Sequence, residues 1–202
     1  MNKNIIVYIL LSLLIFSGCA KKVVFKFESS NNLLIKKIKE ANLYPCNFKG
    51  KAVINYEDRL YKVKFKSLFN KKCDRDAKFY ILGVLNSIAA EIDIEDGKVI
   101  VKKAKEDVSS DLRNFLNNVN ASSLIGLLNI PYKTPFDVKD KKVQGENLIL
   151  VDNKGVIFTV DRNYKIISIK KGENEIKYNY SGKTINSIEF KGKETHLLVT
   201  FI

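Results

Sequence analysis

Residues 61–66 read Tyr-Lys-Val-Lys-Phe-Lys, a strict alternation of large apolar side chains with lysine. Successive side chains of a β-strand point to opposite faces of the sheet, so this period of two predicts a strand with one buried face and one face in water. Antiparallel sheets commonly expose one face, whereas parallel sheets are covered on both. The stretch therefore predicts an antiparallel sheet whose inner face carries Val63 and Phe65.

The same pattern extends on both sides of this strand. Further strands are predicted over 50–56, 78–82, 89–95, 98–102, 148–151, 156–160, 164–169, 176–180, 185–190 and 197–202. Helical periodicity predicts a first helix that is capped by one of residues 29–31 and ended by Tyr44-Pro45, and a second that begins at Ser109 or Ser110 and carries apolar residues as far as Val119. A shorter apolar helix begins at Asn120 or Ser122 and is stopped by Pro131, while the polar residues 132–146 predict a loop. About eleven strands interrupted once by helices predict a mainly β, α+β fold, in which one curved antiparallel sheet wraps over the helices.

The N-terminus has the form of an export signal. Residues 5–16 are twelve mostly apolar residues, which is too short for a membrane span of about twenty. Ser17 and Gly18 directly before Cys19 resemble the lipobox of bacterial lipoproteins, in which this cysteine receives a diacylglycerol; the alternative is a secretory signal with an incidental cysteine. We expect a signal peptide over 1–18, a lipidated tether over 19–30 and a single domain over 31–202.

Charge and composition limit the chemistry. The 202-residue chain carries 35 Lys and Arg against 22 Asp and Glu, a formal charge of +13. Such a charge is typical of nucleic-acid binding, but export argues against that partner. Anionic lipid headgroups, an acidic protein surface and a merely solvated lysine face are the alternatives. One histidine and three cysteines leave almost no ligands for zinc, so we expect no metal site and no cofactor.

Cys46 and Cys73 each precede a predicted strand, and these two strands are expected to run in the same direction. Both cysteines would then lie at the same end of the sheet, and an exported location permits a disulfide. A bridge and two separate thiols are equally compatible with the sequence. No histidine lies near either cysteine in the sequence to activate it, so we expect neither to be catalytic.

Three parts of the chain resemble the LolA/LolB lipoprotein-carrier superfamily, and Cys19 makes the outer-membrane receptor LolB the better match. These parts are residues 79–87, reading Phe-Tyr-Ile-Leu-Gly-Val-Leu-Asn-Ser before a strand, the short apolar helix between Ser122 and Pro131, and the closing run of hairpins. The resemblance implies an incomplete antiparallel barrel of about eleven strands covered by a few helices. It also implies that lipoprotein acyl chains lie in the hollow between sheet and helices.

The resemblance implies two kinds of site residue. Receptors of this family carry an exposed, insertion-promoting leucine between the third and fourth strands, which matches Leu85 beside Val84; the alternative is that Leu85 folds back onto the core. The acyl-chain cavity would be lined by apolar side chains of the inner face, most of which would also face inward in a fully packed core. The candidates are Ile54, Tyr56, Val63, Phe65, Ile81, Ile92, Ile94, Val99, Val101, Leu124, Leu128, Phe158, Ile176, Tyr178, Ile188, Phe190 and Val199.

The function implied by the resemblance is that of a non-enzymatic, monomeric protein anchored by lipid to the outer membrane and facing the periplasm. It would accept acylated lipoprotein cargo from a periplasmic LolA-like carrier and help insert it in the membrane. No Asp follows Cys19, which favours the outer membrane. The alternatives are a carrier of another lipid and a structural scaffold lipoprotein without cargo. A hydrolase needs a nucleophile with a base or a carboxylate pair, and neither is evident.

Overall fold

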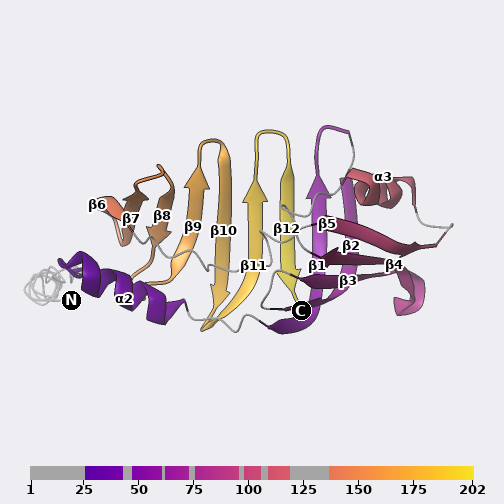
Figure 1. Ribbon diagram of the computed structural model, residues 1–202, viewed down its shortest axis with the longest axis horizontal. Coiled ribbons are helices and arrows are strands. Elements are labelled where there is room, and N and C mark those ends of the chain that lie inside the picture. The colour runs from indigo at the N-terminus through magenta and orange to yellow at the C-terminus, as the bar shows by residue number, and fades with distance from the viewer. Residues whose placement is uncertain are drawn as a thin grey trace, which may run out of the picture.

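The computed structural model describes residues 26–42, 47–60, 62–72, 76–95, 98–105, 109–118 and 137–202. These residues form a single antiparallel sheet of twelve strands, curved into an open half-barrel (Figure 1). The strand order is β5-β4-β3-β2-β1-β12-β11-β10-β9-β8-β7-β6. Neighbours in the sheet are therefore neighbours in the chain except in the middle, where β1 pairs with β12. The predicted class, an incomplete antiparallel barrel with few helices, is confirmed.

The elements have these bounds. The strands are β1 Phe48–Glu57, β2 Lys62–Lys71, β3 Ala77–Leu82, β4 Ile88–Glu95, β5 Lys98–Ala104, β6 Val138–Gln144, β7 Asn147–Asp152, β8 Ile157–Val160, β9 Ile166–Lys171, β10 Asn174–Ser181, β11 Thr184–Lys191 and β12 His196–Phe201. The helices are α2 Asn31–Ala41 and α3 Ser110–Asn118, with a single 3-10 turn, η1 Val84–Asn86, between β3 and β4.

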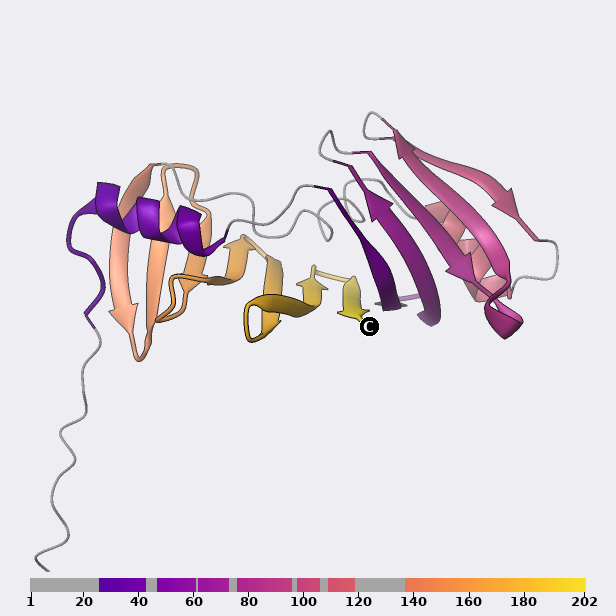
Figure 2. The ribbon, with the colours of Figure 1, turned by 90° about the horizontal axis from the view of Figure 1, so that it is seen from below.

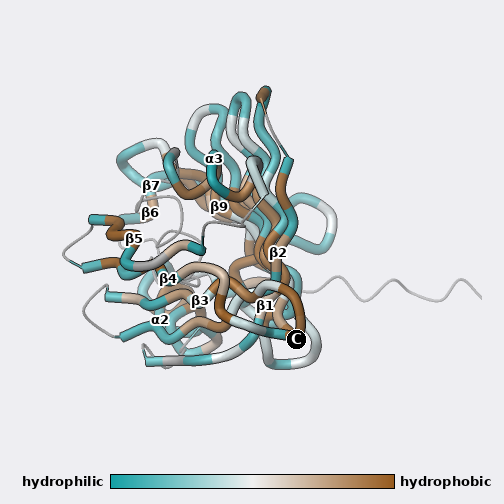
Figure 3. The backbone as a smooth tube through the Cα atoms, turned by 90° about the vertical axis from the view of Figure 1, so that its right-hand side faces the viewer, coloured by the Kyte–Doolittle hydropathy of each residue, from teal (hydrophilic) through white to brown (hydrophobic). Residues whose placement is uncertain are grey.

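The alternation along β2 is confirmed by burial. Val63 and Phe65 are buried, whereas Lys62, Lys64 and Lys66 are exposed. Paired residues of neighbouring strands share a face, so the register extends this inner face across the sheet. One inner row crosses eight strands through Val63, Tyr56, Leu197, Phe190, Ile176, Ile169, Phe158 and Leu150. In Figure 3 hydrophobic segments run along the strands, and the loops at the rim are mostly hydrophilic.

Two helices cover different parts of the inner face. Helix α2 lies against the end of the sheet that contains β6 to β8, and α3 lies inside the bend formed by β1 to β5 (Figure 2). Leu34 and Ile38 of α2 are fully buried, as is Phe115 of α3 at 1% exposure, and all three join one apolar cluster with the sheet. The Ser109 hydroxyl caps α3 by accepting a hydrogen bond from the Leu112 N–H at 3.2 Å.

The loop predicted over 132–146 is wrong for residues 138–144, which form the edge strand β6. This strand pairs with β7 through its backbone, and nearly all of its side chains are exposed. An edge strand that buries so little carries no apolar alternation, and the lysines at 139, 141 and 142 are typical of a protected edge. Its sequence therefore lacks the signal from which the other strands were predicted.

Several predictions fall outside the described residues, namely the signal peptide, Cys19, Cys46, Cys73 and the apolar helix 122–130. The expected direction of the two strands after the cysteines is nevertheless confirmed, because Phe48 of β1 and Ala77 of β3 both pair with Lys71 of β2. The disulfide itself stays a prediction. Within the part of the chain that the structure describes, no helix has the length and apolar character needed to cross a bilayer.

Candidate functional site

The predicted cavity residues share the inner face of the sheet. Fifteen of the seventeen lie in described strands, and the strand register places all fifteen on this face; Leu124 and Leu128 lie outside the described residues. Ten are buried: Ile54, Val63, Phe65, Ile81, Ile92, Ile94, Phe158, Tyr178, Ile188 and Val199. Tyr56, Val99, Ile176 and Phe190 are half-buried, and Val101 is 39% exposed.

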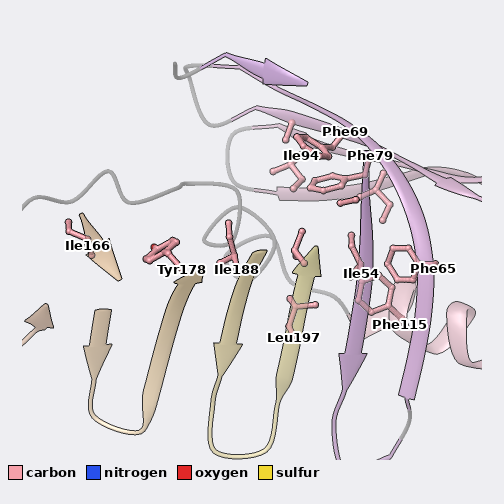
Figure 4. Close-up of a cluster of buried hydrophobic side chains, with 14 of the residues drawn as sticks. Ile54, Phe65, Phe69, Phe79, Ile94, Phe115, Ile166, Tyr178, Ile188 and Leu197 are labelled. Atoms are coloured by element: carbon pink, nitrogen blue, oxygen red, sulfur yellow. The ribbon is translucent and has the colours of Figure 1, made fainter. Parts of the chain in front are cut away.

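The middle of the inner face offers apolar surface with little polar chemistry. A second row runs across five strands through Phe65, Ile54, Val199, Ile188 and Tyr178 (Figure 4). At one end of this row Phe115 of α3 packs against it, with ring centroids 5.1 Å from Phe65 and 5.2 Å from Tyr56. Such a surface suits flexible hydrocarbon chains, which need apolar contact and no directional hydrogen bonds.

Sequence reasoning missed the part of this face that lies near α2. Leu148, Leu150, Val160 and Ile166 are buried there at 0–2% exposure. The alternation within the predicted strand 148–151 indicates that Leu148 and Leu150 share the inner face. The other two needed the register of β8 and β9, which contains a bulge at Thr159 and Val160.

A buried asparagine holds α2 in place. The Asn42 side-chain amide donates hydrogen bonds to the Ile38 carbonyl at 2.7 Å and to the Tyr164 carbonyl at 2.8 Å. Its side-chain oxygen accepts the Ile166 N–H at 3.1 Å. The end of α2 is thereby joined to the turn between β8 and β9. Phe27, just before the helix, packs edge-on against the Tyr164 ring at 5.8 Å.

The loop between β3 and β4 exposes two apolar side chains. Val84 is 84% exposed and Leu85 is 95% exposed. The loop is closed at its base by the Gly83 N–H, which donates to the Ser87 carbonyl at 2.7 Å. Leu85 and Asn86 have φ angles of 54° and 60°, in the left-handed region that a leucine rarely adopts. Leu85 therefore points away from the core; what it contacts in function stays a prediction.

Solved structures share this architecture. A LolA superfamily protein from Nitrosomonas europaea superposes with a TM-score of 0.53 at 10% identity, over 87% of this chain and 92% of that one. This chain therefore shares its fold with that LolA superfamily protein. A DUF1329 family protein from Desulfovibrio piger ATCC 29098, at 8% identity, and an outer membrane lipoprotein-sorting protein domain from Vibrio parahaemolyticus, at 6%, each give 0.48 over 84% of this chain and 88% of theirs. No family model and no curated protein matches the sequence.

Three shallow hollows on this LolA-like sheet are lined by described residues. One of about 480 Å³ lies where β9 and β10 diverge, beside Ser168, Lys177 and Asn179. Two of about 430 Å³ lie between the β1–β2 and β11–β12 hairpins and along the exposed side of α2. The first hollow also touches Tyr178 of the second inner row, whereas the other two are lined by no residue of either inner row. None of them extends along the inner face, so the acyl cavity stays a prediction. Among the described residues, no group of three His, Cys, Asp or Glu side chains could hold a metal ion.

The outer face of the LolA-like sheet contains one buried carboxylate. The Asp93 side chain is 1% exposed and lies between Lys78, whose Nζ is 3.0 Å away, and Lys102. Burial works to raise the pKa of Asp93, but hydrogen bonds from Lys102 and Lys78 and their positive charges hold it below its usual range. The same hydrogen bonds raise the pKa of both lysines. The second carboxylate oxygen, Oδ1, has no hydrogen-bond partner among the residues that the structure describes.

We expect Asp93→Asn to lower the free energy of unfolding by about 1–3 kcal/mol at neutral pH, because it removes two charge-assisted hydrogen bonds. The pKa of Asp93 is depressed on folding, so this contribution is present above the unfolded pKa of about 4 and is lost as the pH falls through the lower folded value. The parent should therefore lose more stability on acidification than the variant does. Urea unfolding at a series of pH values measures this difference.

Glu95→Gln is the matched control, since the Glu95 side chain is 52% exposed and its oxygen lies 3.6 Å from the same Lys102 Nζ. An exposed pair of this kind contributes little. Equal stability losses in the two variants would show that burial of Asp93 does not strengthen the cluster.

Proposed function

We propose that this protein is a lipid-anchored, monomeric envelope protein that binds the acyl chains of lipoproteins and helps insert them in the outer membrane. The observation that carries the proposal is the continuous apolar inner face, one row of which crosses eight strands of a half-barrel with the LolA-superfamily fold. The cargo would arrive on a periplasmic LolA-like carrier. The reaction involves no bond breaking, so the protein acts as a receptor and not as an enzyme.

Access of acyl chains to this face requires movement of its cover. Ten of the candidate residues are buried, and α2 and α3 pack on two parts of the face. Apolar contacts between helix and sheet are non-directional, so cargo chains can replace them with a small net change in free energy. The proposal therefore includes displacement of covering side chains when cargo binds.

The membrane anchor in this proposal is Cys19, which becomes the first residue of the mature chain. Diacylglycerol and an N-acyl chain on one residue would hold the protein stably on a bilayer, since each buried methylene contributes about 0.8 kcal/mol. Mass spectrometry of the mature N-terminus should show the acyl mass on Cys19. Cys19→Ala should abolish that mass and leave a soluble or uncleaved chain; a parent protein without the acyl mass would refute the anchor.

Cargo binding is tested with a diacylated peptide that carries a photoreactive acyl chain. We expect the full chain to be labelled on inner-face strands, and unlabelled diacylated peptide to compete. A structural scaffold is the second candidate, because the inner face is already well packed, and it predicts no labelling. Competition by phospholipid but not by diacylated peptide would instead identify a carrier of another lipid.

We also propose that Val84 and Leu85 enter the membrane during delivery. Leu85→Glu should leave folding and cargo uptake unchanged, because the side chain is 95% exposed. It should slow transfer of acylated cargo to vesicles about tenfold or more, because an apolar contact worth about 1.5–2 kcal/mol is replaced by a charge. Transfer from loaded protein to anionic vesicles is the measurement.

Val143→Glu provides the control for this experiment. Val143 is 52% exposed on the edge strand β6, at the other end of the sheet, so the same substitution there should not change transfer. Leu85 would be a neutral or a core residue if Leu85→Glu transferred as fast as the parent or unfolded the protein.

A further inference from the structure

The hairpin between β1 and β2 presents a second exposed leucine. Leu60 is 88% exposed and lies just after β1, before β2 begins at Lys62. Asp58 fixes the turn, since its Oδ1 accepts the Leu60 N–H at 2.8 Å and its Oδ2 accepts the Tyr56 hydroxyl at 3.0 Å. Arg59 pairs with Glu194 of the β11–β12 hairpin at 2.6 Å. The tip is held by these contacts, and Leu60 stays outside the core.

Four lysines without acidic partners lie behind this tip on the outer face. Lys49 and Lys51 belong to β1, and Lys64 and Lys66 belong to β2; we call them the basic patch. Lys66 pairs with Val53 and Lys51 with Leu68, so these two lysines are diagonal neighbours, roughly 7–8 Å apart between their Cα atoms. Within the described part of the chain, none of the four forms an ion pair or a side-chain hydrogen bond.

Several other lysines of the outer face are paired with carboxylates, unlike the four of the basic patch. Lys62 binds Glu57 at 2.7 Å, Lys191 binds Glu189 at 3.1 Å, and Lys78 and Lys102 bind Asp93. Lys64 and Lys66, the members of the patch nearer the tip, together with the exposed Leu60 combine positive charge with one apolar side chain. This combination complements an anionic bilayer, in which phosphates lie above an apolar layer.

The Leu60 hairpin and the Val84–Leu85 loop lie at the same end of the strands. Strand β1 ends and β2 begins at the Leu60 hairpin, and Lys66 near the start of β2 pairs with Leu82 at the end of β3. The β1–β2 hairpin and the β3–β4 loop therefore project from the same end of neighbouring strand pairs. The twist of the sheet turns them in different directions (Figure 1).

We propose that Leu60 and the basic patch form a docking surface for an anionic bilayer, with Leu60 at the acyl boundary and the lysines at the phosphates. This inference rests on the proposed function only in that the protein works at a membrane, and it does not require cargo. An acidic protein surface could attract the lysines too, but it would offer no acyl layer for the leucine.

The test uses tryptophan, because the chain contains none. Leu60→Trp is introduced in the full chain, which is reconstituted in vesicles with phosphatidylglycerol or with phosphatidylcholine alone. With phosphatidylglycerol we expect a blue-shifted emission and strong quenching by lipids brominated on their acyl chains. Val143→Trp is the matched control, an exposed aliphatic position on β6 at the far end of the sheet, and should show neither effect.

Charge reversal tests the basic patch in the same background. Each lysine near an anionic surface contributes about fivefold in binding, so Lys64→Glu with Lys66→Glu should reduce quenching of the tryptophan at position 60 at least that much. Added salt should act in the same direction. Quenching that is unchanged by charge reversal and equal in phosphatidylcholine would overturn the role of the lysines. Quenching no stronger than in Val143→Trp would overturn the docking surface.

Failure of this inference is distinguishable from failure of the proposed function. Labelling by the acylated peptide reports cargo binding and does not depend on Leu60. Cargo labelling without quenching at position 60 would refute the docking surface alone. Quenching at position 60 without cargo labelling would refute the carrier and support the docking surface.

Discussion

Phe65→Asp is expected to unfold the protein or to lower its free energy of unfolding by at least about 4 kcal/mol. The side chain is buried at 9% exposure, pairs with Ile54 on β1 and packs on the Phe115 ring of α3 at 5.1 Å. An unpaired carboxylate at this position would lose its hydration without gaining a counter-charge. Domains of this size have a free energy of unfolding of about 5–15 kcal/mol, so a loss of this size would remove much or all of it. Urea unfolding of parent and variant measures it.

Asn70→Asp is the control for this variant. It makes the same change in charge on the same strand, but position 70 is exposed on the outer face. Substitutions at such positions change stability by about 0.5 kcal/mol or less. Similar losses in both variants would mean that the two faces of β2 do not differ in burial, and the assignment of the inner face would fail.

Asn42→Ala is expected to lower the free energy of unfolding by about 2–4 kcal/mol. It removes three hydrogen bonds and leaves the buried Ile166 N–H without its partner, and an unsatisfied buried group costs about 1–3 kcal/mol by itself. Because these bonds join α2 to the β8–β9 turn, amide hydrogens of α2 should also exchange faster. Equilibrium unfolding and hydrogen exchange provide the two measurements.

Asn32→Ala separates this effect from helix propensity. Asn32 lies within α2, whereas Asn42 follows its last residue. Asn32 is exposed, and alanine is the better helix former, so its replacement should be neutral or slightly stabilising. If Asn42→Ala behaved like Asn32→Ala, the hydrogen bonds of Asn42 would not hold the helix in place.

Alternation of side chains made most of the sheet predictable. Residues such as Val63 and Phe65 carry a period-two pattern because one face of each strand is buried, and this pattern is local in sequence. The inner face could therefore be predicted one strand at a time. Strand β6 could not be predicted in this way, because an exposed edge strand needs no apolar side chains.

Contacts between distant residues could not be predicted. Asn42 meets Tyr164 and Ile166 across more than 120 residues of chain, and nothing near Asn42 in the sequence indicates that partner. Asp93 likewise reads as an exposed charge in an alternating strand. It is buried only because the register brings Lys78 of β3 beside it and Lys102 of β5 over it. The docking role proposed for Leu60 could not be predicted from the sequence, because a single exposed apolar residue in a turn is common.

The pairing of β1 with β12 has a consequence for how the chain assembles. Every other strand pair joins neighbours in the sequence, whereas this pair joins residues roughly 140–150 positions apart. The strands β1 to β5 and β6 to β12 can therefore each form by short hairpin steps, and the seam between them closes last. Because β12 comes last of the twelve strands along the chain, β1 keeps an unpaired edge until β12 has been synthesised. A chain that stopped before β12 would expose that edge permanently, as a template for pairing with other chains.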